Sequence, residues 1–320
     1  MDHKLILKLQ NSMFPEFVNG FEPRKNKGSI TGGQLYSDLK YGGKYPNSYV
    51  DLYKSNKSKH GKAPLVIYCH GGGYTWGDKV EGDPNAGDKS FCLFQDFIDH
   101  GYDVASVNYA LAPEFQYPVP MLQLDECIQF LISHAEEYRL DVDRVILIGS
   151  SAGAHLAGQY ADAVTNEAYA SGIGIHPVLK QEQLMAFVSQ SGLLDNERFD
   201  RTDSGIFNFV LRRCGRAYFD VKKLQGDPKV IETNVINNMT ENFPPVFISD
   251  GNVGTFTDQA VDMADRAKSL GLTYELKLYP KETAKLGHGF EAGQAVQAVE
   301  VRNLMFQFLE KLKTDTMICS

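Results

Sequence analysis

The feature that most constrains this chain is an alternation of short β-rich runs with longer helical patterns, which begins at about residue 64. Apolar and β-branched residues are concentrated at 65–69, 104–109, 145–148, 186–188, 246–248 and 274–278. Between and after these runs, apolar residues recur at helical spacing, at 121–131, 156–160, 263–270 and 304–312. Strands that alternate with crossover helices form a mostly parallel, doubly wound sheet. The sequence therefore predicts an α/β fold.

Two segments do not follow this alternation. Residues 1–45 are rich in Gly, Asn and aromatic residues, among them Phe14, Phe17 and Phe21, and residues 196–240 combine an amphipathic run with a charged one. Two interpretations stay open for both: small cap segments over the C-terminal edge of the sheet, or irregular packing segments without a gating role. A chain of 320 residues fits a single domain with such caps.

The pentapeptide Gly-Ser-Ser-Ala-Gly at 149–153 matches the G-x-S-x-G pattern. Its glycines allow a tight turn from strand to helix, which lifts the side chain of Ser151 clear of the backbone. The pattern directly follows the run at 145–148 and directly precedes a helical pattern, which is the context that this turn requires. The alternative is a Gly/Ser turn that only caps a helix. We interpret Ser151 as a nucleophile.

A glycine-rich loop, His70-Gly71-Gly72-Gly73, follows the first of the β-rich runs. Three glycines let backbone N–H groups approach a substrate oxygen with no Cβ in the way, and such donors stabilise the charge of a tetrahedral intermediate. The alternatives are a flexible loop or a phosphate cradle, but no Gly-Lys-Ser/Thr follows, and the next residues, Tyr-Thr-Trp, would crowd a phosphate. His70 itself is expected to orient the loop rather than to transfer protons.

A base for the serine is predicted at His288, which lies between two glycines in the loop after the run at 274–278. An unperturbed imidazole titrates near neutral pH, as such a base requires. Of the eight histidines, only His288 lies between a late strand and the terminal helix. The alternative is a histidine in a surface loop without a catalytic role.

Together these motifs resemble a known superfamily. The combination of HGGG at 70–73, GSSAG at 149–153 and HGF at 288–290, with LAPE at 111–114, is similar to the hormone-sensitive-lipase-like and feruloyl-esterase-like (BD-FAE-like) branches of the α/β hydrolases. The resemblance covers roughly residues 45–312, in the chain order Ser, Asp, His.

The resemblance implies the α/β-hydrolase fold and a serine carboxylesterase that cleaves esters of small or aromatic acyl groups. It implies an acyl-enzyme intermediate, with no metal and no cofactor. By the same resemblance, Gly72, Gly73 and Ala152 would supply the N–H groups of the oxyanion hole.

The chain departs from the superfamily at the acid of the triad. That acid usually lies about three residues beyond the strand at 245–248, where this sequence has Gly254. Asp258, at the start of the next helix, is the predicted acid that orients His288. Asp250, at the end of the strand, is the alternative. The other role for Asp258 is a favourable negative charge in the first turn of its helix. If neither aspartate serves, the site lacks its orienting carboxylate.

Composition excludes several classes of partner. The formal net charge of −8 argues against nucleic acid and anionic membranes, which need basic patches. No apolar run approaches 18 residues, and the N-terminal apolar stretch is too interrupted for a signal peptide. The five cysteines are widely spaced and odd in number, so neither a zinc site nor a disulfide framework is indicated. We expect a cytoplasmic protein with a small-molecule ester substrate.

The same residues are compatible with two other functions. Kynurenine-formamidase-like and acylaminoacyl-peptidase-like relatives cleave amide bonds with the same residues, so the triad does not separate esters from amides. A binding-only, inactive relative would explain Gly254 at the acid position. However, such a protein would have no use for both Ser151 and His288.

Overall fold

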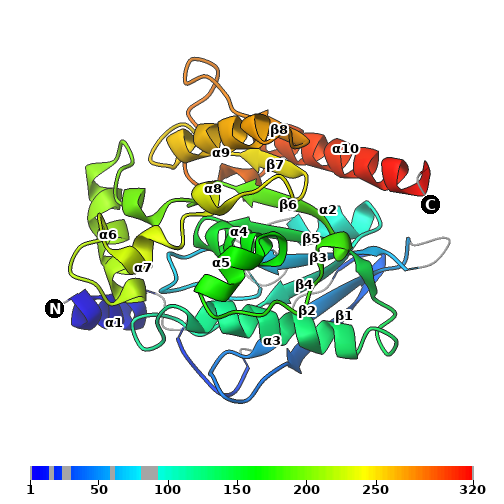
Figure 1. Cartoon of the computed structure of the whole chain (residues 1–320), viewed down its shortest axis with the longest axis horizontal. Coiled ribbons are helices and arrows are strands. Elements are labelled where there is room, and N and C mark those ends of the chain that lie inside the picture. The colour runs from blue at the N-terminus through cyan, green and yellow to red at the C-terminus, as the bar shows by residue number, and fades with distance from the viewer. Residues whose placement is uncertain (1, 14–17, 24–29, 58–61, 81–92, 319–320) are drawn as a thin grey trace.

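The computed structural model describes residues 2–13, 18–23, 30–57, 62–80 and 93–318. Their central element is a mixed eight-stranded sheet with the strand order β1-β2-β4-β3-β5-β6-β7-β8 (Figure 1). The strands are β1 (Gly33–Lys40), β2 (Tyr49–Ser55), β3 (Pro64–Cys69), β4 (Asp103–Val107), β5 (Asp141–Ser150), β6 (Leu184–Gln190), β7 (Val246–Ser249) and β8 (Tyr274–Lys277). All pairs from β4 to β8 are parallel, which confirms the predicted α/β fold.

The sequence did not predict the two strands at one edge. β1 pairs antiparallel with β2, and β2 pairs antiparallel with β4. β1 is an edge strand of mostly half-exposed residues, interrupted by an irregularity between Tyr36 and Leu39, so it has no continuous apolar run. In β2, the buried Asp51 interrupts the apolar pattern. Asp38 of β1 and Asp51 of β2 both pair with the buried Lys79. Both strands are therefore defined by their pairing and by these ion pairs rather than by their own composition.

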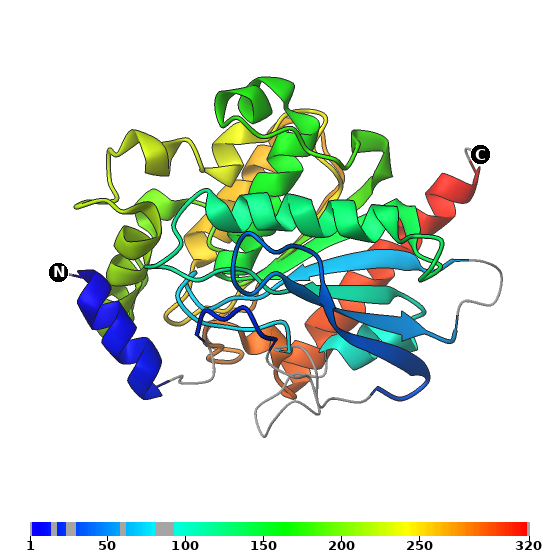
Figure 2. The same cartoon turned by 90° about the horizontal axis from the view of Figure 1, so that it is seen from below.

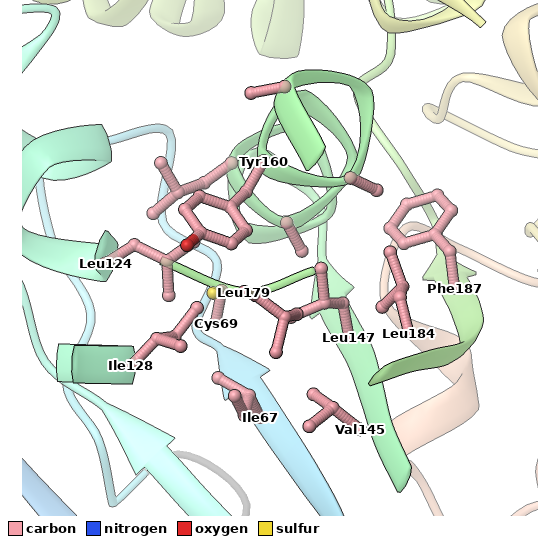
Figure 3. Close-up of a cluster of buried hydrophobic side chains, with 14 of the residues drawn as sticks. Ile67, Cys69, Leu124, Ile128, Val145, Leu147, Tyr160, Leu179, Leu184 and Phe187 are labelled. Atoms are coloured by element: carbon pink, nitrogen blue, oxygen red, sulfur yellow. The ribbon is translucent and has the colours of Figure 1, made fainter. Parts of the chain in front are cut away.

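Helices cover both faces of the sheet. On one face lie α3 (Val119–Ser133), α4 (Ala152–Thr165) and α9 (Thr257–Ser269); on the other lie α2 (Leu93–Asp99) and α10 (Val296–Ile318), as Figure 2 shows for α3 and α10. Strand residues with alternate side-chain directions fill the two cores. Figure 3 shows part of the first core, where Ile67 and Leu147 of the sheet meet Leu124, Ile128 and Tyr160.

A third cluster of buried side chains lies where the parallel strands end. It joins residues that follow β3, β5, β6 and β7 to α1 (Asp2–Met13), α6 (Gly205–Phe219) and α7 (Pro228–Ile231). α1 and α6 lie side by side beyond one end of the sheet (Figure 1). The remaining helices, α5 (Glu167–Gly172) and α8 (Val235–Asn238), border α4.

Residues 1–45, for which a cap was one interpretation, contribute to two different parts of the fold. Gly33–Lys40 belongs to the sheet, and only α1 packs against α6. Phe14 and Phe17 lie outside the described residues, and Phe21 is 57% exposed. In the part of the chain that the structure describes, no helix is both long and apolar enough to cross a bilayer. The cytoplasmic location stays a prediction.

Candidate active site

Ser151 lies on the sharp turn between β5 and α4. Its backbone has φ 55° and ψ −120°. Residues other than glycine adopt this conformation only at a cost in free energy. The two glycines of the motif make the turn possible. A Cβ on Gly149 would lie 2.2 Å from the backbone of Gly153, and one on Gly153 would lie 2.1 Å from the carbonyl oxygen of Cys69. The local sequence therefore imposes the strand-turn-helix geometry that exposes Ser151 Oγ to the site.

His288 lies beside the serine, in the loop between β8 and α10. Its Nε2 is 2.9 Å from Ser151 Oγ. The rings of Phe207 and Phe256 flank the imidazole at centroid distances of 5.5 and 5.3 Å. This burial lowers the pKa of His288 to about 4, because a buried imidazolium loses its hydration. The imidazole is therefore neutral at neutral pH and free to accept a proton.

The other ring nitrogen of His288 contacts a hydroxyl rather than a carboxylate. Nδ1 is 2.9 Å from Thr255 Oγ1, and Thr255 Oγ1 donates to Oδ1 of Asp250. The hydrogen bonds run in one direction if Nδ1 carries the proton: Nδ1–H to Thr255, and Thr255 O–H to Asp250. That arrangement leaves Nε2 as the acceptor for the serine hydroxyl.

Asp258, the predicted acid, does not contact His288. Its carboxylate is 3.0 Å from Nη1 of Arg198, and its side chain is 54% exposed. Both ring nitrogens of His288 have other partners among the described residues, namely Ser151 and Thr255. Asp258 lies in the first turn of α9, whose start directs it to solvent. The predicted contact is thus corrected: Asp250, the alternative, connects to His288 through Thr255.

The acid position of the superfamily has no side chain here. Gly254 has a φ of +61°, and its N–H donates to Asp203 Oδ1. A Cβ on Gly254 would have only Ser204 Cβ within 4 Å, at 3.6 Å. Room for a side chain therefore exists at this position, and the next residue, Thr255, supplies the contact to the imidazole.

The glycine loop after β3 faces the same site. Gly72 and Gly73 have φ values of +91° and +57°, and a Cβ on Gly72 would lie 2.1 Å from the carbonyl oxygen of Trp76. Among the described residues, nothing accepts a hydrogen bond from the N–H groups of Gly72, Gly73 or Ala152, the first residue of α4. These donors remain available to an oxygen of a bound ligand.

His70 supports this loop, as expected. Its ring stacks on that of Tyr109 with centroids 4.1 Å apart and planes 4° from parallel. Its Nδ1 is 2.9 Å from the carbonyl oxygen of Gly71, and the hydroxyl of Tyr109 donates to the carbonyl oxygen of His70 at 2.7 Å. The imidazole is fully buried, so it has no access to a substrate.

A cavity of about 220 Å³ joins these groups. Ser151, His288 and the glycines of the loop line it together with apolar or aromatic side chains, those of Tyr68, Trp76, Leu93, Phe207 and Leu211. Gln190 and Glu291 add polar groups to the lining. Phe207 and Leu211 belong to α6, so the segment at 196–240 supplies part of the wall.

Two site residues could not be found from the sequence. Thr255 is an ordinary loop threonine, and Glu291, which lines the same cavity, is a single acidic residue three positions after His288. Neither belongs to a motif. The one available signal was the glycine at position 254, because an absent acid requires a substitute nearby.

Comparison with known proteins adds to this geometry. The family model BD-FAE matches residues 50–268, more than half of the chain. The chain belongs to the BD-FAE family. The match includes the glycine loop, Ser151 and Asp250 but ends before His288. This membership confirms the resemblance to α/β-hydrolase esterases that the sequence motifs indicated.

Curated relatives and solved structures agree with this assignment. An esterase of Gibberella moniliformis is 32% identical over 255 residues, which are 73% of this chain and 70% of the relative. Esterase LipI of Mycobacterium tuberculosis is 24% identical over 76% of this chain and 71% of its own. Esterase B of Lactobacillus rhamnosis has the same fold, with a TM-score of 0.75 at 18% identity over 98% of this chain and 97% of that one. A bacterial heroin esterase has a TM-score of 0.64 at 20% identity, over 88% and 84% of the two chains.

Proposed function

We propose that this protein hydrolyses carboxylic esters of small or aromatic acyl groups, with Ser151 as the nucleophile. The observation that carries the proposal is the 2.9 Å contact between Ser151 Oγ and Nε2 of a neutral His288, inside a cavity that the glycine loop also lines. Membership of the BD-FAE family and the esterase names of the relatives support the same activity.

Each step of the reaction uses a group at this site. Ser151 Oγ attacks the ester carbon as His288 Nε2 takes the hydroxyl proton. The carbonyl oxygen becomes an oxyanion, which the N–H groups of Gly72, Gly73 and Ala152 stabilise. His288 then protonates the leaving alcohol, and the acyl group stays on Ser151. A water molecule repeats the sequence and releases the acid.

Thr255 and Asp250 take the orienting role in this mechanism. The Thr255 hydroxyl holds the proton of His288 on Nδ1, and Asp250 holds the hydroxyl. When His288 becomes an imidazolium, the carboxylate of Asp250 stabilises its charge across one hydroxyl group. A direct contact would stabilise that charge more strongly, since Coulomb energy falls with distance.

The size and chemistry of the cavity support a small acyl group. A volume of about 220 Å³ lies below the roughly 300–1,000 Å³ of pockets for drug-sized ligands. The walls from Trp76, Phe207 and Leu211 are apolar or aromatic, which favours a short aliphatic or a single-ring acyl group.

The nucleophile can be tested with a fluorophosphonate probe and an activity assay. We expect the wild type to be labelled, and Ser151→Ala to fold, to remain unlabelled and to lose kcat by a factor on the order of 10⁴–10⁶. The matched control is Ser171→Ala, which removes an exposed hydroxyl of α5. Comparable turnover by Ser151→Ala would overturn the serine mechanism.

The substrate class can be tested with the wild type alone. A hydrolysis screen would compare p-nitrophenyl esters of graded chain length with methyl ferulate and with N-formylkynurenine, an amide. We expect acetyl to butyryl esters or methyl ferulate to give the highest kcat/KM. A preference for N-formylkynurenine would instead establish the amide-cleaving alternative.

A further inference from the structure

A second buried carboxyl group lies next to the proposed relay. Glu291, in the single turn after His288, is 1% exposed. Its Oε1 accepts the Ser191 N–H at 2.9 Å and the Ser249 hydroxyl at 3.0 Å, and its Oε2 accepts the Ser191 hydroxyl at 2.8 Å. Ser249 directly precedes Asp250, so the two carboxyl groups lie at the same strand end. Glu291 is therefore fixed in place beside the residue that holds Thr255.

Glu291 also holds the backbone next to the histidine. The Ser191 hydroxyl that donates to Glu291 accepts the N–H of Gly289 at 2.9 Å. Gly289 follows His288 directly in the chain. The position of the imidazole thus depends on Glu291 through a hydrogen-bonded serine.

No cation among the described residues contacts either carboxyl group. The guanidinium of Arg302 on α10 donates to the backbone oxygens of Glu291 and Gly293 at 2.6 and 2.7 Å, and its Nε pairs with Asp96 on α2 at 2.6 Å. His288 contacts Asp250 through Thr255 and lines the same cavity as Glu291. Oδ2 of Asp250 has no hydrogen-bond partner in the described part of the chain.

Two carboxyl groups in such surroundings resist being ionised together. Burial raises the pKa of Asp250, and the charge of Glu291 raises it further. Burial also raises the pKa of Glu291. Removal of a carboxylate from water disfavours its charge, and a like charge nearby adds to that effect. Both carboxyl groups therefore titrate at higher pH than exposed carboxyl groups do.

We propose that Glu291 is a positioning residue whose charge opposes the ionisation of Asp250 and so sets the pH at which the relay to His288 becomes fully active. The proposal rests on the proposed esterase function. His288 is already neutral above about pH 5, since its pKa is lowered to about 4. Above that pH, any further increase in activity comes from the ionisation of Asp250, because its negative charge stabilises the imidazolium. Activity should consequently rise with pH through the neutral range.

The test is the pH profile of kcat/KM for a p-nitrophenyl acetyl ester, corrected for spontaneous hydrolysis. Glu291→Gln keeps the shape and an acceptor oxygen but removes the charge. We expect its acidic limb to move to lower pH by about one unit or more, because Asp250 loses its like-charged neighbour. The control, Glu182→Gln, removes an exposed carboxylate and should leave the limb unchanged.

A purely structural role predicts another result. If Glu291→Gln lowers the plateau but leaves the midpoint of the limb in place, the proposal is wrong. Asp250→Asn provides a second test should Glu291→Gln fail to fold, because a neutral amide in place of this carboxyl group should remove the limb and leave a low, flat profile. A wild-type limb in Asp250→Asn would equally overturn the proposal.

Failure of the inference and failure of the proposed function give different results. Fluorophosphonate labelling of the wild type at pH 8 reports only on the activated serine. An unlabelled wild type contradicts the esterase mechanism itself. A labelled wild type with an unmoved limb in Glu291→Gln contradicts only the role of Glu291.

Discussion

At the scale of single residues, His288 is held by a hydroxyl rather than directly by a carboxylate. Thr255 connects its Nδ1 to Asp250, while Asp258 forms an exposed ion pair with Arg198. Exposed ion pairs contribute at most about 1 kcal/mol to stability, and neither Asp258 nor Arg198 is among the residues that line the cavity. Substitutions of Asp250, Thr255 and Asp258, which lie between the end of β7 and the first turn of α9, should therefore affect catalysis differently.

Mutation of these residues should separate their roles. Thr255→Val keeps the shape of the side chain but leaves a buried N–H of His288 without an acceptor, which costs about 1–3 kcal/mol. We expect kcat to fall roughly 10–100-fold in Thr255→Val and at least as far in Asp250→Asn, and to change little in Asp258→Asn. Steady-state kinetics on a short-chain ester would decide. A large loss confined to Asp258→Asn would restore the original assignment.

At the scale of elements, α1 joins α6 to the glycine loop after β3. Ile6 of α1 is fully buried in the cluster that contains Leu211 of α6. On the same helix, the Gln10 side chain donates to the carbonyl oxygen of Ala112 at 2.9 Å and to that of Thr75, next to the glycine loop. Since Leu211 also lines the cavity, packing of α1 should influence which acyl groups fit.

Ile6→Ala tests this connection. Truncation of a buried isoleucine costs about 2–5 kcal/mol and leaves a cavity beneath α6. We expect kcat/KM to change more for long-chain esters than for the acetyl ester, since α6 forms the cavity wall rather than the triad. The control is Lys8→Ala, an exposed position on the same helix. A proportional decline for all esters would mean that α1 serves only stability.

At the scale of the whole molecule, one buried lysine connects the sheet edge to the site. Lys79 follows the glycine loop, and its Nζ lies 2.9 Å from Asp38 of β1 and 3.0 Å from Asp51 of β2. The Ser106 hydroxyl of β4 donates to its carbonyl oxygen at 2.5 Å. The antiparallel edge of the sheet and the segment after the glycine loop are therefore joined through Lys79.

Lys79→Met should destabilise the protein by about 3–5 kcal/mol, because it removes the ammonium group that pairs with the buried carboxylate of Asp51. Urea unfolding followed by circular dichroism measures the change. The double variant Lys79→Met/Asp51→Leu should recover much of the loss, and Lys40→Met, at an exposed position of β1, should change little. Unfolding of Lys79→Met at the same urea concentration as the wild type would contradict this account.

Sequence alone determined the features that local backbone geometry imposes. The β-rich runs from 65 to 278 became parallel strands because continuous apolar segments must be buried on both faces. Ser151 and the glycine loop were predictable because a strained turn and a close backbone approach require glycine at fixed positions, and His288 because it is the histidine that follows the last strand.

Only the tertiary structure decided which groups support that core. Thr255 and His288 are 33 residues apart, and Ser191 and Glu291 are 100 apart, so their contacts depend on how separate loops fold against one another. Asp258 lies close to the expected acid position in sequence, yet the start of α9 directs its side chain to solvent. The contact to His288 comes from Thr255, one residue after the expected position 254. The direction of a side chain in such a loop depends on the fold of the loop, which no local sequence pattern predicts.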